Sequence, residues 1–215
     1  MRASSWPPLV VVAALGLGWS PDALAQDDEP IGWLVADLRG SLVPYRQNVD
    51  LAFKRGYNPS ITPSVGLGFE TGAHFYFFRW RVITFGVGGS FHTSLGDRRA
   101  KETDPDPDGP ILRKTFTAVS PQLSFNFGGH NGWSYVSGGL GTSRLSLFTP
   151  NEDEPPQRSA NTLNYGGGAR WFVNPHVAFS LDLRFYAMSP LEQTDTARGS
   201  PRMTVMVLSI GASFK

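Results

Sequence analysis

The dominant feature of the chain is an alternation of apolar with small or polar side chains. In residues 64–77 the odd positions from Val65 to Phe77 are mostly apolar, and the even positions from Ser64 to Tyr76 are mostly Gly or polar. Residues 83–95 repeat the pattern, with apolar side chains from Ile83 to Leu95. A period of two over a dozen residues predicts half-buried β-strands.

Six further segments follow the same rule, which gives eight predicted strands in all. The Gly-rich segment 133–147 has an unclear register, and a β-bulge there is one interpretation. The six segments are 32–42, 115–127, 133–147, 162–173, 177–187 and 202–214.

The first two strands described above are predicted to form a hairpin about a tight turn at Arg79-Trp80. Pairing about that turn sets Phe69 opposite Phe91. The apolar and polar faces then match across the hairpin, as a stable register requires.

The connections between the predicted strands alternate in length. The long ones are 43–61, 96–114, 148–161 and 188–201, and the short ones are 78–81, 128–132 and 174–176. Long extracellular loops and short periplasmic turns are the rule in outer-membrane barrels. The pattern predicts an all-β fold: an eight-stranded antiparallel up-and-down transmembrane β-barrel with both ends in the periplasm.

The aromatic residues favour the same interpretation, because they gather where membrane interfaces would lie. One predicted girdle lies near the short turns and a thinner one near the long loops. A soluble β-sandwich, the alternative fold, has no reason to sort its aromatics this way. The first girdle comprises Trp33, Phe75, Phe77, Trp80, Phe125, Phe127, Trp133, Trp171 and Phe214, and the second Phe91, Phe116, Phe148 and Phe185.

The first 25 residues resemble a secretory signal peptide. Arg2 gives a positive start, residues 9–17 are apolar but too short to span a bilayer, and Ala23 and Ala25 form a small-x-small cleavage site. Cleavage would leave Gln26 as the first mature residue. We therefore expect a signal peptide over 1–25 and one barrel domain over 26–215.

Composition removes several classes of function. The net charge of +1 gives no reason to expect nucleic acid as a partner. There is no Cys, so disulfides, thiol nucleophiles and Cys metal sites are absent. The slightly negative mean hydropathy of -0.18 suits a barrel, in which half of each strand faces a polar interior.

Several segments resemble the outer-membrane-protein β-barrel family that includes the OmpA transmembrane domain and OmpX. They are residues 66–72 (GLGFETG), 135–141 (YVSGGLG), 164–172 (NYGGGARWF) and 177–186 (VAFSLDLRFY). The resemblance covers roughly residues 31–215. It implies insertion into the outer membrane of a Gram-negative cell envelope. It also implies recognition by the barrel-assembly machinery through a C-terminal strand ending at Phe214, although Lys215 follows the aromatic residue.

The inward faces of the strands carry the candidate chemistry. An eight-stranded barrel is just wide enough for its own interior side chains. We expect a structural network of balanced acids and bases there rather than a catalytic or metal site, and no cofactor. Its members are Asp37, Arg39, Glu70, His74, His92, Arg170, Asp182 and Arg184, with Gln122 and Asn126 beside them.

The sequence thus favours a non-enzymatic, monomeric barrel in contact with outer-membrane lipid and lipopolysaccharide, with a structural or adhesion-like role through its four long loops. One alternative is a lipid-modifying enzyme using His92 and Ser90, and another is an ion- or solute-conducting barrel. In the loop 96–114, Asp104 to Gly109 imitate half of an EF-hand. An EF-hand loop closes with a Glu, and the corresponding position here is Thr115. We therefore expect an acidic solvated loop rather than a Ca²⁺ site.

Overall fold

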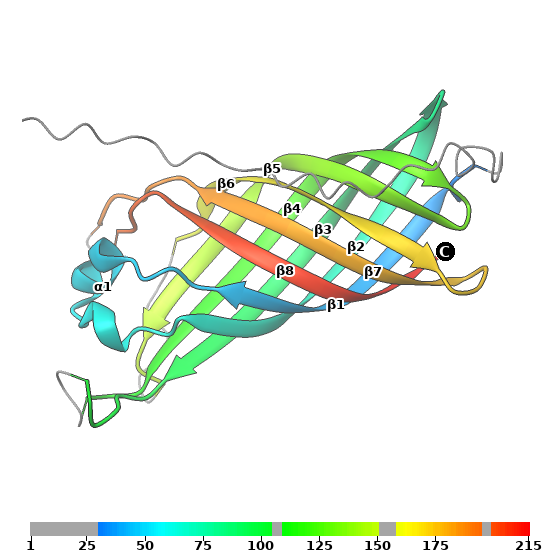
Figure 1. Ribbon diagram of the computed structural model, residues 1–215. Coiled ribbons are helices and arrows are strands. Elements are labelled where there is room, and N and C mark those ends of the chain that lie inside the picture. Colours follow the sequence, from blue (N-terminus) through cyan, green and yellow to red (C-terminus); the bar gives the residue numbers. More distant parts are fainter. Residues whose placement is uncertain (1–29, 105–108, 151–157, 195–198) are drawn as a thin grey trace, which may run out of the picture.

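The computed structural model describes residues 30–104, 109–150, 158–194 and 199–215, and shows one antiparallel barrel (Figure 1). All eight predicted strands are present, most of them longer than predicted. They are β1 (Leu34–Pro44), β2 (Val65–Trp80), β3 (Ile83–Arg98), β4 (Leu112–Gly129), β5 (Gly132–Phe148), β6 (Ala160–Phe172), β7 (Val177–Met188) and β8 (Met203–Phe214).

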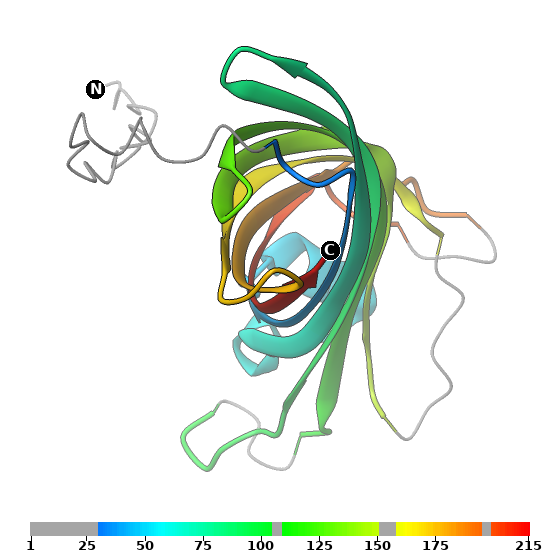
Figure 2. The ribbon, with the colours of Figure 1, turned by 90° about the vertical axis from the view of Figure 1, so that its right-hand side faces the viewer.

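Each strand pairs with its neighbours in sequence, and β1 pairs with β8 to close the sheet. Closure leaves no strand edge unpaired, which a bilayer requires because it offers no water to exposed backbone groups. Figure 2 looks along the barrel from the end that carries the C-terminus and the short turns. We call this the turn end and the opposite end, with the long connections, the loop end.

The first hairpin corrects the predicted register. The turn lies at Arg81 and Val82 rather than at Arg79-Trp80, and Arg81 takes a positive φ of 55°. Phe69 therefore pairs with Thr93, two residues beyond the predicted Phe91. The register also shifts between Tyr76 and Phe78, so the β2–β3 hairpin contains a bulge-like irregularity. An error of two residues leaves every side chain on its predicted face.

The strand whose register was unclear, β5, contains no bulge. Its pairing with β4 has the same offset at both ends, with Val119 opposite Thr142 and Leu123 opposite Gly138. Inward side chains alternate regularly from Trp133 to Leu147. The bulge interpretation of this segment is therefore wrong.

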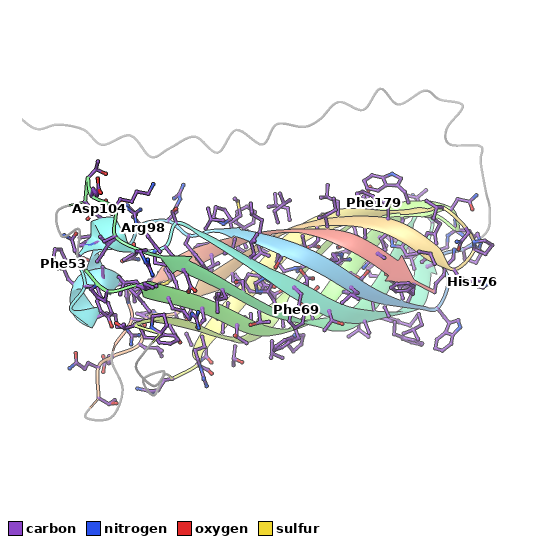
Figure 3. The ribbon with its side chains drawn as sticks, turned by 90° about the horizontal axis from the view of Figure 1, so that it is seen from below. Phe53, Phe69, Arg98, Asp104, His176 and Phe179 are labelled. Atoms are coloured by element: carbon purple, nitrogen blue, oxygen red, sulfur yellow. The ribbon has the colours of Figure 1, made fainter. Side chains whose placement is uncertain are left out.

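The surface of the barrel is inverted relative to a soluble protein. Apolar residues face outward on every strand, as Phe69 and Phe179 do in Figure 3. On β4 this apolar face extends from Phe127 to Val119 and gives way to Thr117 towards the loop end. An apolar outer band with a polar interior is the arrangement of transmembrane barrels. The chain is a transmembrane β-barrel of the outer-membrane type.

The girdle at the turn end is largely as predicted, with Trp33, Trp80 and Trp171 all more than half exposed. Three predicted girdle members are wrong, because Trp133, Phe116 and Phe148 are buried, the first two inside the barrel. Trp133 and Phe116 lie on the inward parity of their strands, together with Tyr135 and Ser120 respectively. Placement by position along the strand alone overlooked that parity.

The first long loop folds over the loop end. It contains α1 (Val49–Arg55) and η2 (Pro59–Ile61). Asn48 caps α1 by accepting a hydrogen bond from the Leu51 N–H, and Gly56 ends it in the left-handed conformation. No helix in the described part of the chain is long and apolar enough to span a membrane. The predicted signal peptide, with Ala23, Ala25 and Gln26, lies outside the described residues.

The depth of the outer band gives a first prediction. Leu123 lies midway along the apolar face of β4, whereas Thr115 lies beyond its loop-end limit. Arginine costs about 2–4 kcal/mol at the bilayer midplane and about 0–1 kcal/mol near an interface. We expect Leu123→Arg to lower the free energy of unfolding by about 2–4 kcal/mol and Thr115→Arg to lower it by about 0–1 kcal/mol. Urea unfolding in lipid vesicles measures both values. Equal costs would contradict the assigned membrane position.

Candidate functional site in the barrel interior

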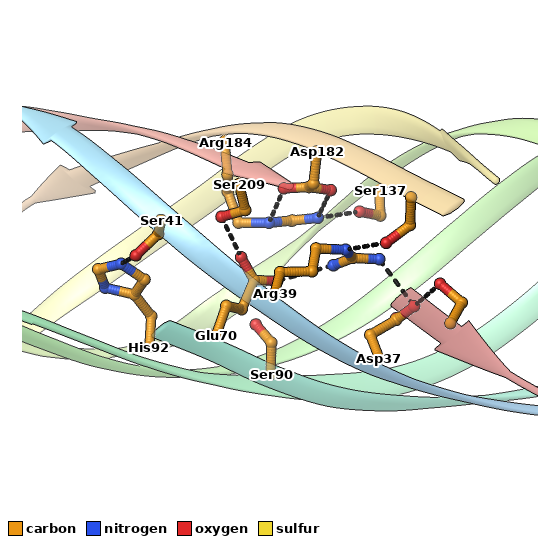
Figure 4. Close-up of polar contacts among 12 residues, drawn as sticks. Asp37, Arg39, Ser41, Glu70, Ser90, His92, Ser137, Asp182, Arg184 and Ser209 are labelled. Carbon is orange, nitrogen blue, oxygen red and sulfur yellow. Dashed lines mark hydrogen bonds and ion pairs between the residues drawn. The ribbon is translucent and has the colours of Figure 1, made fainter. Parts of the chain in front are cut away.

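The structure places all eight predicted interior residues inside the barrel, each no more than 4% exposed. Six of them form a set of ion pairs and hydrogen bonds that the Tyr135 hydroxyl makes continuous, and part of it is drawn in Figure 4. We call these six the interior network. They are Asp37 and Arg39 on β1, Glu70 on β2, Arg170 on β6, and Asp182 and Arg184 on β7.

Asp37 is the acceptor shared by two arginines. Its carboxylate receives Arg170 Nε at 3.0 Å and Nη2 at 2.6 Å, a bidentate pair. Arg39 Nη2 lies 2.8 Å from the same carboxylate, and the Ser213 hydroxyl also donates to it. Bidentate contact fixes the geometry of the guanidinium group as well as its charge. Asp37 therefore links β1 to β6 across the lumen and to its neighbour β8 within the sheet.

Arg39 extends the network to Glu70. Its Nη1 lies 3.1 Å from Glu70 Oε1, and its Nε donates to Ser180 Oγ at 2.9 Å. Ser209 donates to the other carboxylate oxygen of Glu70 at 2.9 Å. Arg39 thus connects the carboxylates of Asp37 and Glu70.

Asp182 and Arg184 form the third part. Arg184 Nη2 lies 3.0 Å from Asp182 Oδ2, and the Tyr135 hydroxyl donates to the same oxygen at 2.7 Å. Arg184 Nε also donates to Asp182 Oδ1 at 3.2 Å, and its Nη2 and Nη1 reach Ser137 and Asn164 respectively. The predicted diagonal placement of Asp182 and Arg170 is confirmed by the register, since Gly168 lies opposite Asp182. Each, however, pairs with another partner.

The interior network contains three carboxylates and three guanidinium groups, so its formal charges cancel. Moving a charge out of water costs several kcal/mol, which attraction offsets only when the geometry is good and every donor and acceptor has a partner. The network meets this condition through Ser, Asn and Tyr side chains from other strands. Its composition is that of an interior built to be neutral and dehydrated.

The two interior histidines lie beside the network. His74 Nδ1 is 3.4 Å from Asp37 Oδ2, and its Nε2 is 3.4 Å from Gln122 Oε1. His92 Nε2 is 2.9 Å from Ser41 Oγ, and Ser90 instead accepts a hydrogen bond from Gln122 at 2.8 Å. His92 also packs on the rings of two aromatic residues and is 0% exposed. The predicted Ser90–His92 combination is not formed.

Sequence reasoning missed that apolar side chains seal the polar interior at both ends. The turn-end cluster is Ile31, Val35, Tyr76, Trp133 and Tyr135, with Phe172 against it. The loop-end cluster includes Val43, Phe116, Leu145, Tyr186 and Val207, and Leu51 of α1 packs into it. Inward parity was the available signal: Phe116 shares the parity of Ser120, and Tyr186 that of Asp182.

In the EF-hand-like stretch, the described carboxylate of Asp104 is bound by residues of its own loop. Asp104 accepts hydrogen bonds from Arg98 at 3.0 Å and from the Lys101 backbone N–H at 2.8 Å. These contacts, the backbone bond first, lower the pKa of Asp104. Residues 105–108 of the EF-hand-like stretch lie outside the described ranges. Among the residues that the structure does describe, no group of three or more His, Asp or Glu is placed to hold a metal ion.

Comparison with known proteins returns only similar structures. No family model and no curated protein matches the chain. It is similar to neisserial surface protein A (13% identity, 85% of this chain and 94% of that one, TM-score 0.46). It is also similar to Ail of Yersinia pestis bound to the heparin analogue sucrose octasulfate (17% identity, 85% and 96%, TM-score 0.47). A third is the outer membrane protein AlkL (16% identity, 87% and 92%, TM-score 0.40).

None of these three similarities is close enough to carry an argument about this chain. At such identities and TM-scores we take no functional argument from them. The fold assignment rests on the strand pairing and the inverted surface of this chain.

The shared role of Asp37 gives a second prediction. Removing one partner of a buried ion pair leaves an uncompensated charge and costs about 3–5 kcal/mol. We expect Asp37→Asn to lower the free energy of unfolding in vesicles by about that amount, since Arg170 would lose its carboxylate partner and Arg39 would keep only Glu70. The matched control is Asp97→Asn, which breaks an exposed ion pair with Arg113 and should cost about 0–1 kcal/mol. Similar losses for both variants would show that burial adds nothing to the Asp37 contacts.

Proposed function

We propose that the protein is a non-enzymatic, monomeric outer-membrane barrel that acts through its loop end, as a surface-interaction or adhesion-like protein. The observation that carries the proposal is the neutral interior network sealed by apolar clusters at both ends. A barrel whose lumen is occupied in this way has its available surfaces outside the lumen. The long loops then become the place for function.

The same observation disfavours a conducting barrel. A water-filled channel needs a wider barrel than eight strands provide. Here Arg170, Arg184 and Glu70 occupy the lumen with no more than 1% of their surface exposed. Ions would have to displace this paired set to pass.

A lipid-modifying enzyme is disfavoured by access. Such an enzyme needs a nucleophile and a base within hydrogen-bond reach at a place that a lipid can occupy. Ser41 and His92 are within that distance, but both point into the lumen, and the ring of His92 is covered by Phe116 and Tyr186. The outer-leaflet lipid lies on the other side of the barrel wall.

The loop end carries the features expected of a contact surface. On α1, Leu51 and Ala52 are buried, while Val49 and Phe53 are 51% and 67% exposed. In Figure 3, Phe53 lies at this end together with Arg98 and Asp104, opposite His176 at the turn end. An anchored helix that presents apolar side chains to solvent favours a protein contact.

Lipid contact is supported at the rim just below. A shallow groove on the outer face of β3, β4 and β5 is lined by Thr93, Thr115, Thr117, Thr142 and Arg144. Hydroxyl groups and an arginine at the limit of the apolar band suit the phosphates and sugars of lipopolysaccharide. At the other end, Phe214 faces outward between Ala36 and Val177, where the assembly machinery is expected to recognise it.

A test compares bacteria that display the full chain with bacteria that lack it, for retention on epithelial-cell monolayers. We expect display to increase retention several-fold. The double variant Val49→Ser/Phe53→Ser should lose that gain, because it removes the exposed apolar pair and leaves the buried side of α1 intact.

The matched control is Val82→Ser, which removes an apolar side chain of equal exposure (67%) at the turn end. It should retain the full gain. All variants should show the same heat-dependent gel mobility, which reports a folded barrel. Equal retention with and without the chain would overturn the surface role.

A further inference from the structure

One cation at the loop end stands apart from the balanced interior. Lys114 lies on the inward face of β4, with 3% of its surface exposed. Its Nζ sits 4.7 Å from the centre of the Tyr45 ring. No carboxylate of the described residues forms an ion pair with it. Burial raises the pKa of Tyr45 to about 12, although Ser94 acts in the opposite direction, so this phenol is neutral and offers no counter-charge.

A largely buried ammonium without a carboxylate partner is costly, since burial of a charge is best compensated by a paired and hydrogen-bonded counter-charge. Each arginine of the interior network has a carboxylate within 3.2 Å. A cation–π contact offsets only part of the cost. Methionine would fill the same space without this penalty, so the charge at position 114 points to a ligand.

The space beside Lys114 has the size of a ligand site. A cavity of about 380 Å³ opens at the loop end, within the range of small-molecule pockets. Arg46 and Arg202 line it as well, and none of the described residues that line it carries a carboxylate. Its other walls include the amides of Gln47 and Asn48, and the apolar side chains of Leu145, Met203 and Val205.

We propose that this cavity binds a small organic oxyanion. The anionic group would lie against Lys114, with Arg46 and Arg202 at the mouth, and the apolar part of the ligand against Leu145 and Val205. A carboxylate or a phosphate ester on a small apolar body fits this combination of charge and wall. The proposal is independent of whether the loops adhere to a surface.

The geometry selects a soluble source for the anion. Lys114 has the inward parity of Phe116 and Ala118, so it faces the mouth of the lumen rather than the lipid. A lipid headgroup would have to pass over the barrel rim to reach it. The cavity is therefore assigned to a free anion from the extracellular solution.

The test measures binding of 4-fluorobenzoate to the full barrel in nanodiscs, by fluorine NMR titration. We expect saturable binding to the wild-type protein, at least tenfold weaker binding of the neutral 4-fluorobenzamide, and at least tenfold weaker benzoate binding to Lys114→Met. The control Lys101→Met removes an exposed cation of the same end that lies outside this cavity, and should bind as the wild type does. Phenyl phosphate should compete with the fluorinated probe.

The free energy of unfolding in urea, measured for the same variants, distinguishes a loss of binding from a loss of folding. Lys114→Met should be at least as stable as the wild type, because an uncompensated charge is removed. Equal benzoate binding by wild type and Lys114→Met would overturn the proposal, as would absence of saturable binding to a folded wild type. A marked loss of stability in Lys114→Met would show that the ammonium is structural. Lys114-dependent retention of anionic lipid without benzoate binding would overturn the soluble source.

Discussion

The structure depends on the compensation of charge inside a barrel that is surrounded by lipid. The outer band is apolar, so every polar side chain on the membrane-spanning strands must find its hydrogen-bond and ion-pair partners in the lumen. Asp37, Glu70 and Asp182 provide the negative charge, and three arginines from β1, β6 and β7 balance it. Arg170 of β6 pairs with Asp37 of β1, so the network also ties distant parts of the sheet together.

This constraint decides where function can reside. The interior network is held between the turn-end cluster and the loop-end cluster, and α1 contributes Leu51 to the latter. The lumen is thereby used for stability. We therefore assign the proposed recognition to the loop end, which has an exposed apolar pair on α1 and a cationic cavity around Lys114. The two features differ in chemistry, since one suits an apolar protein surface and the other a small anion.

Much of the fold follows from the sequence because the strands of a membrane barrel face lipid on one side and the lumen on the other. Apolar and polar residues therefore alternate along each strand. The eight strands and the facing of Glu70, Arg170 and Asp182 could be predicted in this way. The turn at Arg81 could not, because it depends on a positive φ and a register shift between Tyr76 and Phe78 that alternation does not record. A register error of two residues changes which residues pair across the strands but leaves each side chain on its predicted face.

The contacts within the lumen were beyond prediction for a different reason. Parity shows that a side chain points inward, but partner choice depends on how far each chain reaches across the barrel. Arg170 reaches Asp37 on the opposite part of the sheet, 133 positions away in sequence. Lys114 went unnoticed because an unpaired charge is recognised only when its surroundings are known.

Ion conductance across a planar bilayer tests the central claim most directly. If the interior network and its two apolar clusters occupy the lumen, the folded wild-type barrel should give no stable conductance steps over the range of voltages that the bilayer withstands. The same preparation should show heat-dependent gel mobility, so that silence reports a closed barrel rather than failed insertion. Reproducible single-channel steps from the folded protein would contradict the account.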